Sequence, residues 1–422
     1  MDISVKMQLE EKLWSWLPSE VLEDTLAFLP FSAFSRFRSV CKRWNSLLSC
    51  PAFLELRKRI PLQTEPCILF QDGAKPNSHT YLNAVHDYTL MLYNTSIGVF
   101  RNVDLQFLEE HLDNRREEVI NNICNTDGGL LLIASLYVDH PKRFSVCNPL
   151  LKCWRQLPIL PATPPTYCHL QRLVVDKLTK TYKVIAVRGQ FRDNMGYVAT
   201  THVYESISNR WNESGSVKLQ LMESMHGRTI VCGKVMYAMT DLRHNTIMAY
   251  NIEDGIWSEI SIHQLRKPSY SIWTTQIKME LKWNRIITVQ VQRVLVGTKG
   301  RLFTVLSGYT ISDIAIWELK IDSTAEWKEL VATIPHRLIV DVFSDINFDV
   351  NDREVDWRWW ATGFEDYIVL RWYDRNFKTS RTIVYDLLQG SWQRSPHTIW
   401  PAGMANYALV QNVGSLSLDM QP

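Results

Sequence analysis

A tryptophan recurs five times along this chain, each time after an apolar segment and a short polar turn. The five copies are Trp154, Trp211, Trp257, Trp327 and Trp392. A glycine precedes three of them by a nearly constant 24 to 27 residues, and these glycines are Gly129, Gly233 and Gly300. Offsets this regular indicate a repeated structural unit, so we expect the fold to place similar units side by side.

Short apolar segments with a period near two fill the same part of the chain and predict β-strands. Examples are CILF at 67–70, LLLIA at 130–134, YKVIAV at 182–187, TIVC at 229–232, KVMYAM at 234–239, IITVQVQ at 286–292 and YIVLRW at 367–372. Each unit consists of a glycine turn, a strand, a longer link, a second strand, a tight polar turn and a strand with the tryptophan. That is most of a four-stranded β-propeller blade.

The first part of the chain has a different pattern, with apolar residues at helical spacing from Leu17 to Leu48. We expect one helix from Pro18 that ends at Pro30, a second from about Ser32, and a third over 40–48. A further helical piece spans 52–59. Three helices this short cannot bury all their apolar side chains among themselves. The surplus surface either binds a partner or packs on the rest of this chain.

The same stretch resembles the F-box motif in order and spacing. The matching residues are Leu17, Pro18, Val21, Leu22, Leu26, Leu29, Pro30, Phe34, Val40, Cys41, Lys42, Arg43, Trp44 and Leu47. The resemblance implies binding to the Skp-type adaptor of a cullin-RING (SCF) ubiquitin ligase. It places Leu17, Pro18, Leu22, Leu26, Val40, Cys41 and Trp44 at or beside the contact.

The repeated body resembles the kelch-type propellers of plant F-box proteins, including the phrase DKLTKTYKV at 176–184. The tryptophans lie 46 to 70 residues apart, which brackets the roughly 50 residues of a kelch unit. A degenerate copy at 80–103, with Phe100 in place of tryptophan, raises the expected number of blades to six. We therefore expect a mainly β protein with a small α domain: a tail at 1–12, a three-helix F-box at 13–60, a kelch-like propeller at 61–415 and a tail at 416–422.

Composition argues against several classes of partner. The 46 basic and 44 acidic residues leave a net charge of +2, and no basic block suggests binding to nucleic acid or to an anionic membrane. No apolar run approaches 18 residues, and the first residues lack the pattern of a secretory signal. The eight cysteines form no CxxC pair. These features predict reduced cysteines and a location in the nucleus or cytoplasm.

The sequence contains no familiar catalytic motif. There is no Walker loop, dinucleotide-binding glycine turn, HExxH or GxSxG, and the eleven histidines are scattered without metal-ligand spacing. We expect no cofactor, no metal and no catalysis by this chain, with a propeller enzyme kept as a remote alternative.

Two intervals, 258–297 and 328–363, are longer than a blade requires and are expected to form loops on one face. The second contains acidic residues beside tryptophans, and we select Asp352, Glu354, Trp357 and Trp360 as candidates for binding a basic or amphipathic peptide. The competing interpretation is that Trp357 and Trp359 pack inward while the acids line a solvated loop.

Four arginines at or near the ends of predicted strands could line the mouth of a central channel and bind a phosphate or an acidic segment. They are Arg188, Arg192, Arg243 and Arg371. The simpler explanation is that each is a solvated charge at a strand end.

The repeated tryptophans are expected to pack between neighbouring sheets, with a direct role in binding as the alternative. The function predicted from these features is a non-catalytic substrate receptor. The F-box would bind the Skp-type adaptor, and through it the cullin and RING subunits, while the propeller would hold a target protein for ubiquitination. The alternative is a propeller that senses a small ligand or glycan and uses the F-box to couple that ligand to partner choice.

Overall fold

The computed structural model describes the chain in segments that together contain two compact units, one through Glu65 and one from Pro66. The described residues are 18–29, 40–47, 50–59, 67–71, 90–94, 99–103, 105–108, 120–136, 143–160, 167–192, 196–219, 229–239, 246–261, 286–289, 293–307, 314–321, 325–343, 354–364, 366–374, 380–394 and 422.

The first unit is helical. Its described helices are α2 (Ser19–Ala27), α4 (Lys42–Ser46) and α5 (Pro51–Arg59). Pro18 precedes α2 as its N-cap residue, within one residue of the expected start. The helix expected from about Ser32 lies outside the described residues, and α4 is shorter than the segment 40–48 predicted for it.

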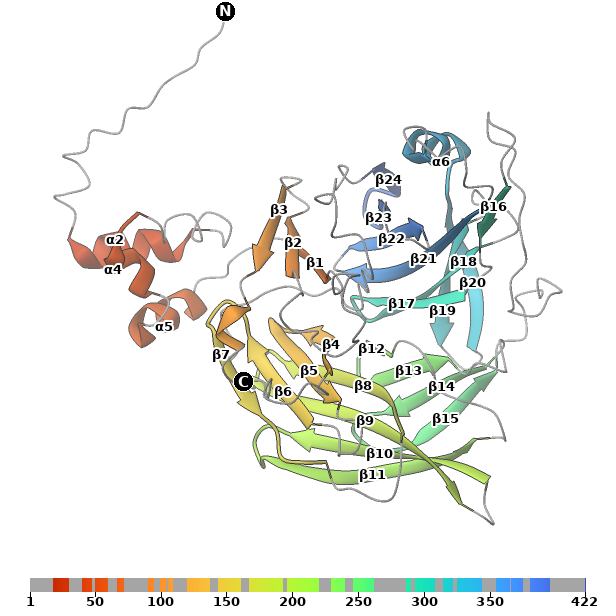
Figure 1. Cartoon of the computed structure of the whole chain (residues 1–422), viewed down its shortest axis with the longest axis horizontal. Coiled ribbons are helices and arrows are strands. Elements are labelled where there is room, and N and C mark those ends of the chain that lie inside the picture. Colours follow the sequence, from red (N-terminus) through yellow and green to blue (C-terminus); the bar gives the residue numbers. More distant parts are fainter. Residues whose placement is uncertain are drawn as a thin grey trace, which may run out of the picture. The chain divides into compact units, whose positions relative to one another are not determined.

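The second unit contains six separate sheets among its described strands (Figure 1). The first has three strands: β1 (Cys67–Gln71), β2 (Leu90–Asn94) and β3 (Val99–Val103). The second consists of β4 (Ile120–Asp127), β5 (Leu130–Leu136), β6 (Arg143–Asn148) and β7 (Cys153–Gln156). The third consists of β8 (Tyr167–Asp176), β9 (Thr181–Arg192), β10 (Gly196–Glu205) and β11 (Arg210–Leu219).

Three more sheets follow along the chain. One contains β12 (Ile230–Cys232), β13 (Val235–Met239), β14 (Thr246–Asn251) and β15 (Trp257–Ser261). The next contains β17 (Arg293–Thr298), β18 (Arg301–Ser307), β19 (Ile314–Ile321) and β20 (Ala325–Thr333). The last contains β21 (Glu354–Phe364), β22 (Tyr367–Asp374), β23 (Ser380–Asp386) and β24 (Ser391–Arg394), with β16 (Ile286–Val289) added beside β21. A short 3-10 helix, η2 (Gln106–Leu108), follows the first sheet, and helix α6 (His336–Phe343) connects β20 to β21.

These sheets are the blades of a β-propeller. Within each of the five blades β4–β7, β8–β11, β12–β15, β17–β20 and β21–β24, four consecutive strands pair antiparallel in chain order, and first strands of neighbouring blades touch, as β4 does with β8, β12 with β17 and β17 with β21. The predicted mainly β fold is confirmed. Five blades have four or more described strands, and the degenerate sixth copy corresponds to the three-stranded sheet, with Phe100 on β3.

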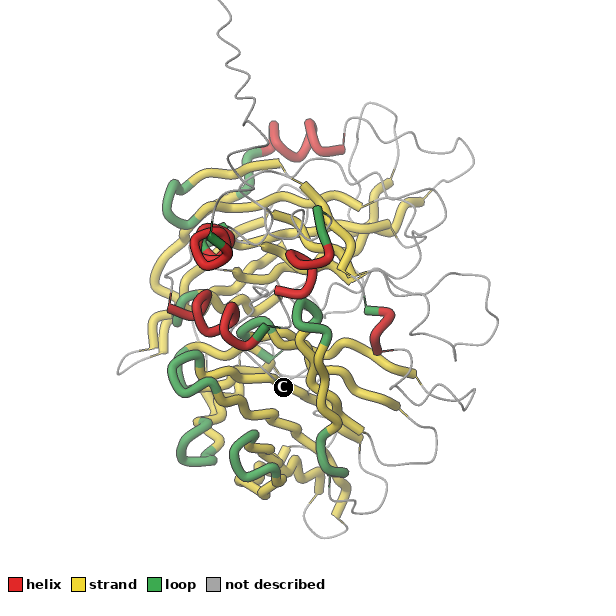
Figure 2. Tube along the Cα trace, turned by 90° about the vertical axis from the view of Figure 1, so that its left-hand side faces the viewer, coloured by secondary structure: helices red, strands yellow, loops and turns green. Residues whose placement is uncertain are grey.

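Antiparallel order gives the propeller two different faces. In every blade the turn between its first and second strands and the turn between its third and fourth strands lie at the same end of the sheet. We call this side the turn face. The links between blades lie at the opposite end. Most of the described turns line up along the left-hand side of Figure 2.

Apolar side chains from facing blades fill the spaces between the sheets. Between the β4–β7 and β8–β11 blades lie Leu132, Val146, Leu173, Val184 and Tyr204, all buried. Equivalent clusters occupy the next three spaces. Helix α6 joins the last of these clusters through Ile339 and Val342, and the guanidinium groups of Arg381 and Arg394 donate hydrogen bonds to carbonyl oxygens near its C-terminal end.

Two kinds of contact hold the inner strands together. Between β4 and β8, the side chains of Asn125 and Asp127 accept hydrogen bonds from the backbone amides of Leu173 (3.2 Å) and Val175 (2.8 Å). Between β17 and β21 the backbones approach so closely that a Cβ atom on Gly363 would lie 2.5 Å from the carbonyl oxygen of Gly297. Glycine is therefore required at this point of the inner ring.

Candidate functional site

The helical unit has its own small core. Leu26 and Ala27 at the end of α2, Leu47 after α4 and Phe53 on α5 are all at most 5% exposed. Each described helix therefore contributes, or is followed by, at least one buried apolar side chain.

Several apolar residues of this unit stay at the surface. Val40 is 61% exposed, Pro18 and Cys41 are also exposed, and Leu22 and Trp44 are half-buried. Val21 and Phe28 add two exposed apolar side chains that were not among the residues selected from the sequence. We call the exposed residues Pro18, Val21, Val40 and Cys41 the apolar surface of the helical unit. Exposed apolar groups of this kind often mark a site of protein association.

Two of the residues selected as adaptor contacts need separate comment. Leu26 is only 3% exposed, so it supports the core behind the apolar surface. Leu17 lies outside the described residues. Thr25 is exposed, and its hydroxyl donates a hydrogen bond to the carbonyl oxygen of Val21 (2.8 Å).

An ion pair links the two helices that carry the apolar surface. The guanidinium of Arg43 on α4 lies 3.0 Å from the carboxylate of Glu23 on α2, and both side chains are partly exposed. Such a pair contributes little stability. It does show that α4 lies beside α2, so Val21 and Val40 belong to neighbouring parts of the unit.

In the propeller, each repeated tryptophan lies on the fourth strand of its blade, directly opposite a residue of the third strand. The opposite residue is tyrosine in three blades, and the ring centroids are 5.5 Å apart for Tyr204 and Trp211, 5.1 Å for Tyr250 and Trp257, and 4.8 Å for Tyr385 and Trp392. In the other two blades Cys147 faces Trp154 and Leu319 faces Trp327. A tyrosine seven residues before the tryptophan was the sequence signal for this pair.

The indole nitrogens of three tryptophans bind to the preceding blade or to the segment that follows it. Trp211 donates to the carbonyl oxygen of Pro158 (2.8 Å), Trp257 to the hydroxyl of Thr201 (2.8 Å) and Trp392 to the carbonyl oxygen of Thr333 (3.0 Å). The expected packing between sheets is therefore confirmed for these three. Trp154 is half-buried, and the side chain of Trp327 lies outside the described residues.

The turn before each of these tryptophans has a common geometry. The residue two positions before tryptophan has a positive φ in four blades: Lys152, Asn209, Gly255 and Gly390. In three of these turns a side-chain oxygen accepts hydrogen bonds from two later backbone amides, and the acceptors are Asn148, Asn251 and Asp386. Short side chains that accept bonds from the chain two or three residues on favour such turns.

The bond from Trp257 to Thr201 gives a direct test of the role of these tryptophans. Thr201 is fully buried, so Trp257→Phe would leave its hydroxyl without this donor. We expect the substitution to lower the free energy of unfolding by about 1–2 kcal/mol, measured from the urea midpoint of the propeller. Thr201→Val is the matched control, and the double variant should lose less than the sum of the two single ones. Additive losses would contradict the coupling.

The two long intervals meet in the structure, which was not foreseen from the sequence. Strand β16, from the first interval, pairs in parallel with the start of β21, which ends the second. Glu354 and Trp357 are opposite Ile286 and Val289 in this register, and Trp360 is opposite Arg371 on β22. Asp352 and the side chains of Glu354, Trp357 and Trp360 lie outside the described residues, so their role in binding remains a prediction.

Neighbouring residues support the view that this strand belongs to a blade. Trp359, between the candidates, is 1% exposed and packs in the core with Ile339 and Trp372.

The expectation that the four arginines are solvated charges at strand ends is wrong for two of them. Arg188 and Arg371 are buried on the second strands of their blades, so neither is a solvated charge at a strand end. Arg192 ends β9, its side chain is not described, and Arg243 lies outside the described residues.

No group of histidine, cysteine and carboxylate side chains that could hold a metal occurs among the described residues. The six described cysteines are free thiols. None of the described helices is long and apolar enough to cross a membrane.

The fold defines a β-propeller protein with a small N-terminal helical domain. Residues 14–56 match the model of the F-box domain. The helical unit is therefore an F-box domain, and the chain is similar to F-box and F-box/kelch-repeat proteins of Arabidopsis thaliana.

Two relatives illustrate the range of this similarity. F-box only protein 6 of Arabidopsis thaliana is 23% identical over 60% of this chain and 49% of its own length. An F-box/kelch-repeat protein of the same plant is 24% identical over 76% of this chain and 73% of its own length. The chain thus spans about half the length of the first of these relatives.

Similarity to solved structures is much weaker. A six-bladed fungal lectin from Aleuria aurantia, for example, is 8% identical, covers 75% of this chain and 93% of its own, and has a TM-score of 0.37. A match at this level supports neither a ligand nor a function for this protein.

Proposed function

We propose that this chain is the substrate-receptor subunit of an SCF-type ubiquitin ligase. Its F-box, assigned to residues 13–60, would bind a Skp-type adaptor and so join the cullin and RING subunits. Its propeller, assigned to residues 61–415, would bind the protein to be ubiquitinated. The observation that carries the proposal is the F-box match at 14–56 in a unit where Leu26, Leu47 and Phe53 are buried while Val21 and Val40 are exposed.

The proposed contribution to ubiquitin transfer is positional. A receptor that holds a target near the charged E2 enzyme raises the effective concentration of the target lysine and leaves the chemistry to other subunits. The free thiols of the described cysteines fit a reducing compartment, and we propose the nucleus and the cytoplasm as the sites of action.

The apolar surface suits helix packing against an apolar groove. Val40 and Cys41 precede α4, Pro18 and Val21 lie at the start of α2, and Trp44 is the residue of this region whose type most often dominates binding energy. In the proposed complex these side chains leave water, and each fully buried aliphatic group contributes roughly 1.5–3 kcal/mol.

A thiol-labelling experiment tests this arrangement on the unmodified chain. Cys41 is exposed, whereas burial raises the pKa of Cys232 to about 11 and that of Cys147 still further. Because the thiolate is the reactive form, iodoacetamide should label Cys41 and leave Cys147 and Cys232 unlabelled. Adding a recombinant Skp-type adaptor should protect Cys41, as read by mass spectrometry of its peptide.

The two buried cysteines provide the internal control in the same sample. They should stay unlabelled with or without the adaptor, since their inertness comes from the propeller core. Equal labelling of Cys41 in the presence and absence of a saturating adaptor would contradict the proposed contact.

A further inference from the structure

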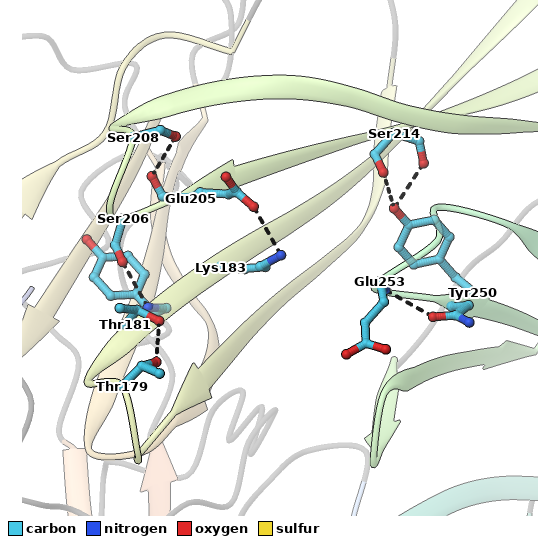
Figure 3. Close-up of polar contacts among 11 residues, drawn as sticks. Thr179, Thr181, Lys183, Glu205, Ser206, Ser208, Ser214, Tyr250 and Glu253 are labelled. Atoms are coloured by element: carbon cyan, nitrogen blue, oxygen red, sulfur yellow. Dashed lines mark hydrogen bonds and ion pairs between the residues drawn. The ribbon is translucent and has the colours of Figure 1, made fainter.

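The β8–β11 blade ends on the turn face in two turns that lie side by side. These are 177–180, between β8 and β9, and 206–209, between β10 and β11. They are tied together by the backbone amide of Ser206, which donates to the carbonyl oxygen of Tyr182 (3.0 Å), and by the amide of Tyr182, which donates to the hydroxyl of Ser206 (2.9 Å). Figure 3 shows Ser206 beside Thr179 and Thr181.

Each turn is also fixed internally. The carboxylate of Asp176 accepts hydrogen bonds from the backbone amides of Leu178 (2.9 Å) and Thr179 (3.3 Å). In the second turn the amide of Asn209 donates to the carbonyl oxygen of Glu205 (2.9 Å), and its side chain accepts from the hydroxyl of Tyr204 (2.9 Å). The two tips are therefore held in a defined shape by groups other than the side chains that they present.

The side chains presented by these tips are aliphatic and exposed. Leu178 is 94% exposed and Ile207 is 82% exposed, although neither side chain can take part in the hydrogen bonds that form its turn. A polar residue would serve the same turns equally well, and β-branched residues such as Ile207 favour strands. Single exposed aliphatic residues are common, but here two stand on adjoining tips of one blade.

The charges around these tips are also distinctive. Residues 176–183 and 205–210 contain four basic and two acidic residues. Figure 3 shows the ion pair of Lys183 with Glu205, in which the nitrogen and the carboxylate oxygen lie 3.0 Å apart. No ion pair within the described part of the chain involves the exposed Lys177, Lys180 or Arg210.

Corresponding turns in the next two blades are neutralised. Lys234, after the first strand of the β12–β15 blade, lies 2.7 Å from the carboxylate of Glu253. Lys299, in the first turn of the β17–β20 blade, pairs with Asp366 of the following blade. The β8–β11 blade thus combines two exposed aliphatic residues with three bases that have no acidic partner among the described residues.

We propose that Lys177, Leu178, Lys180, Ile207 and Arg210, which we call the tip patch, form a binding site for an acidic protein segment that carries apolar side chains. Leu178 and Ile207 would contact the apolar residues, while the three bases would contact carboxylates. The proposal rests on the proposed function, and it assigns target recognition to the turn face and to a class of sequence.

The composition of the tip patch favours a protein segment over other polyanions. Single-stranded nucleic acids are usually held by aromatic platforms beside a basic groove, and the tip patch contains no aromatic residue. Attraction to anionic membranes generally requires clusters of four to eight bases, and the tip patch has three. Two aliphatic side chains flanked by bases match a short peptide in which acidic and apolar residues alternate.

The test uses the full chain in complex with its Skp-type adaptor and a displayed library of random dodecapeptides. We expect the selected peptides to combine aspartate or glutamate with leucine, isoleucine or phenylalanine. Synthetic copies should lose roughly tenfold in affinity for the Lys177→Glu/Lys180→Glu variant and for Leu178→Ser/Ile207→Ser. Binding should also weaken as salt is raised.

Two matched variants serve as controls and should bind the peptides like the wild-type chain. Leu388→Ser removes a residue that is 78% exposed on the equivalent turn of the β21–β24 blade, and Lys218→Glu reverses an exposed charge near the far end of β11. All variants should still co-purify with the adaptor, which separates failure of the tip patch from failure of the proposed function.

Several results would overturn the proposal. These are a selection that yields no binder, selected peptides without acidic residues, and selected peptides that bind the tip-patch variants unchanged. Equal affinity for oligo-dT or for phosphatidylserine vesicles would reassign the tip patch to a general polyanion site.

Discussion

Val40→Asp is expected to weaken binding of the Skp-type adaptor at least roughly a hundredfold, about 3 kcal/mol. Val40 is 61% exposed in the chain alone, so an aspartate there remains hydrated and the helical unit keeps its fold. In the complex the same carboxylate would be taken out of water without a partner, and that loss of hydration opposes association. Isothermal titration calorimetry with recombinant adaptor measures the difference directly.

The control for Val40→Asp is the same change at an equally exposed aliphatic residue of the propeller. Leu388→Asp places a carboxylate on a turn that is 78% exposed, and it should leave the adaptor affinity unchanged. Circular dichroism of both variants should match the wild-type chain. If Val40→Asp bound the adaptor as tightly as Leu388→Asp, the apolar surface would not be the docking site.

Gly363→Ala is expected to lower the free energy of unfolding of the propeller by about 3 kcal/mol. The added methyl group would lie 2.5 Å from the carbonyl oxygen of Gly297 and 2.9 Å from a methyl carbon of Val296. The first of these atoms belongs to the backbone of β17, so no side-chain rotation can relieve the clash. The inner strands β17 and β21 would have to separate, which would disturb the packing between two blades.

Gly300→Asn is the matched control for Gly363→Ala. Gly300 lies in the turn of the β17–β20 blade with φ of +72°, and a Cβ atom there would meet no neighbour within 4 Å. Because asparagine tolerates this backbone conformation better than most residues, we expect a change of about 0.5 kcal/mol or less. The urea midpoint compares the two variants, and equal midpoints would show that the inner ring is less tightly packed than the structure indicates.

The propeller could be predicted from the sequence because the blades repeat one pattern of strands, turns and a tryptophan. Trp211, Trp257 and Trp392 occupy equivalent places, and three of the five repeated tryptophans follow a first-turn glycine by 24 to 27 residues. The tyrosines at 204, 250 and 385 have the same period, but the cross-strand pairs were not predicted from them. Turns and packing between adjacent strands depend on residues that are close together in the chain, so short sequence patterns predict them.

The contacts that could not be predicted join residues far apart in the chain. The pairing of Ile286–Val289 with Glu354–Trp357 depends on where two long intervals return to the propeller, and apolar periodicity says nothing about that. Arg188 and Arg371 look like surface charges because their burial depends on the facing blade. In the helical unit the apolar stripe was clear, but only the structure separates Leu26, which is in the core, from Val40, which is at the surface.

The parallel pairing of β16 with β21 also has a consequence for synthesis of the chain. Residue 354 follows residue 286 by 68 positions, so at about 5–20 residues per second the ribosome needs several seconds to supply the partner of β16. During that interval the entire β17–β20 blade emerges while the β-prone segment IITV has no native neighbour. We expect chaperones that shield exposed strands to engage the nascent protein at this stage, before its last blade can form.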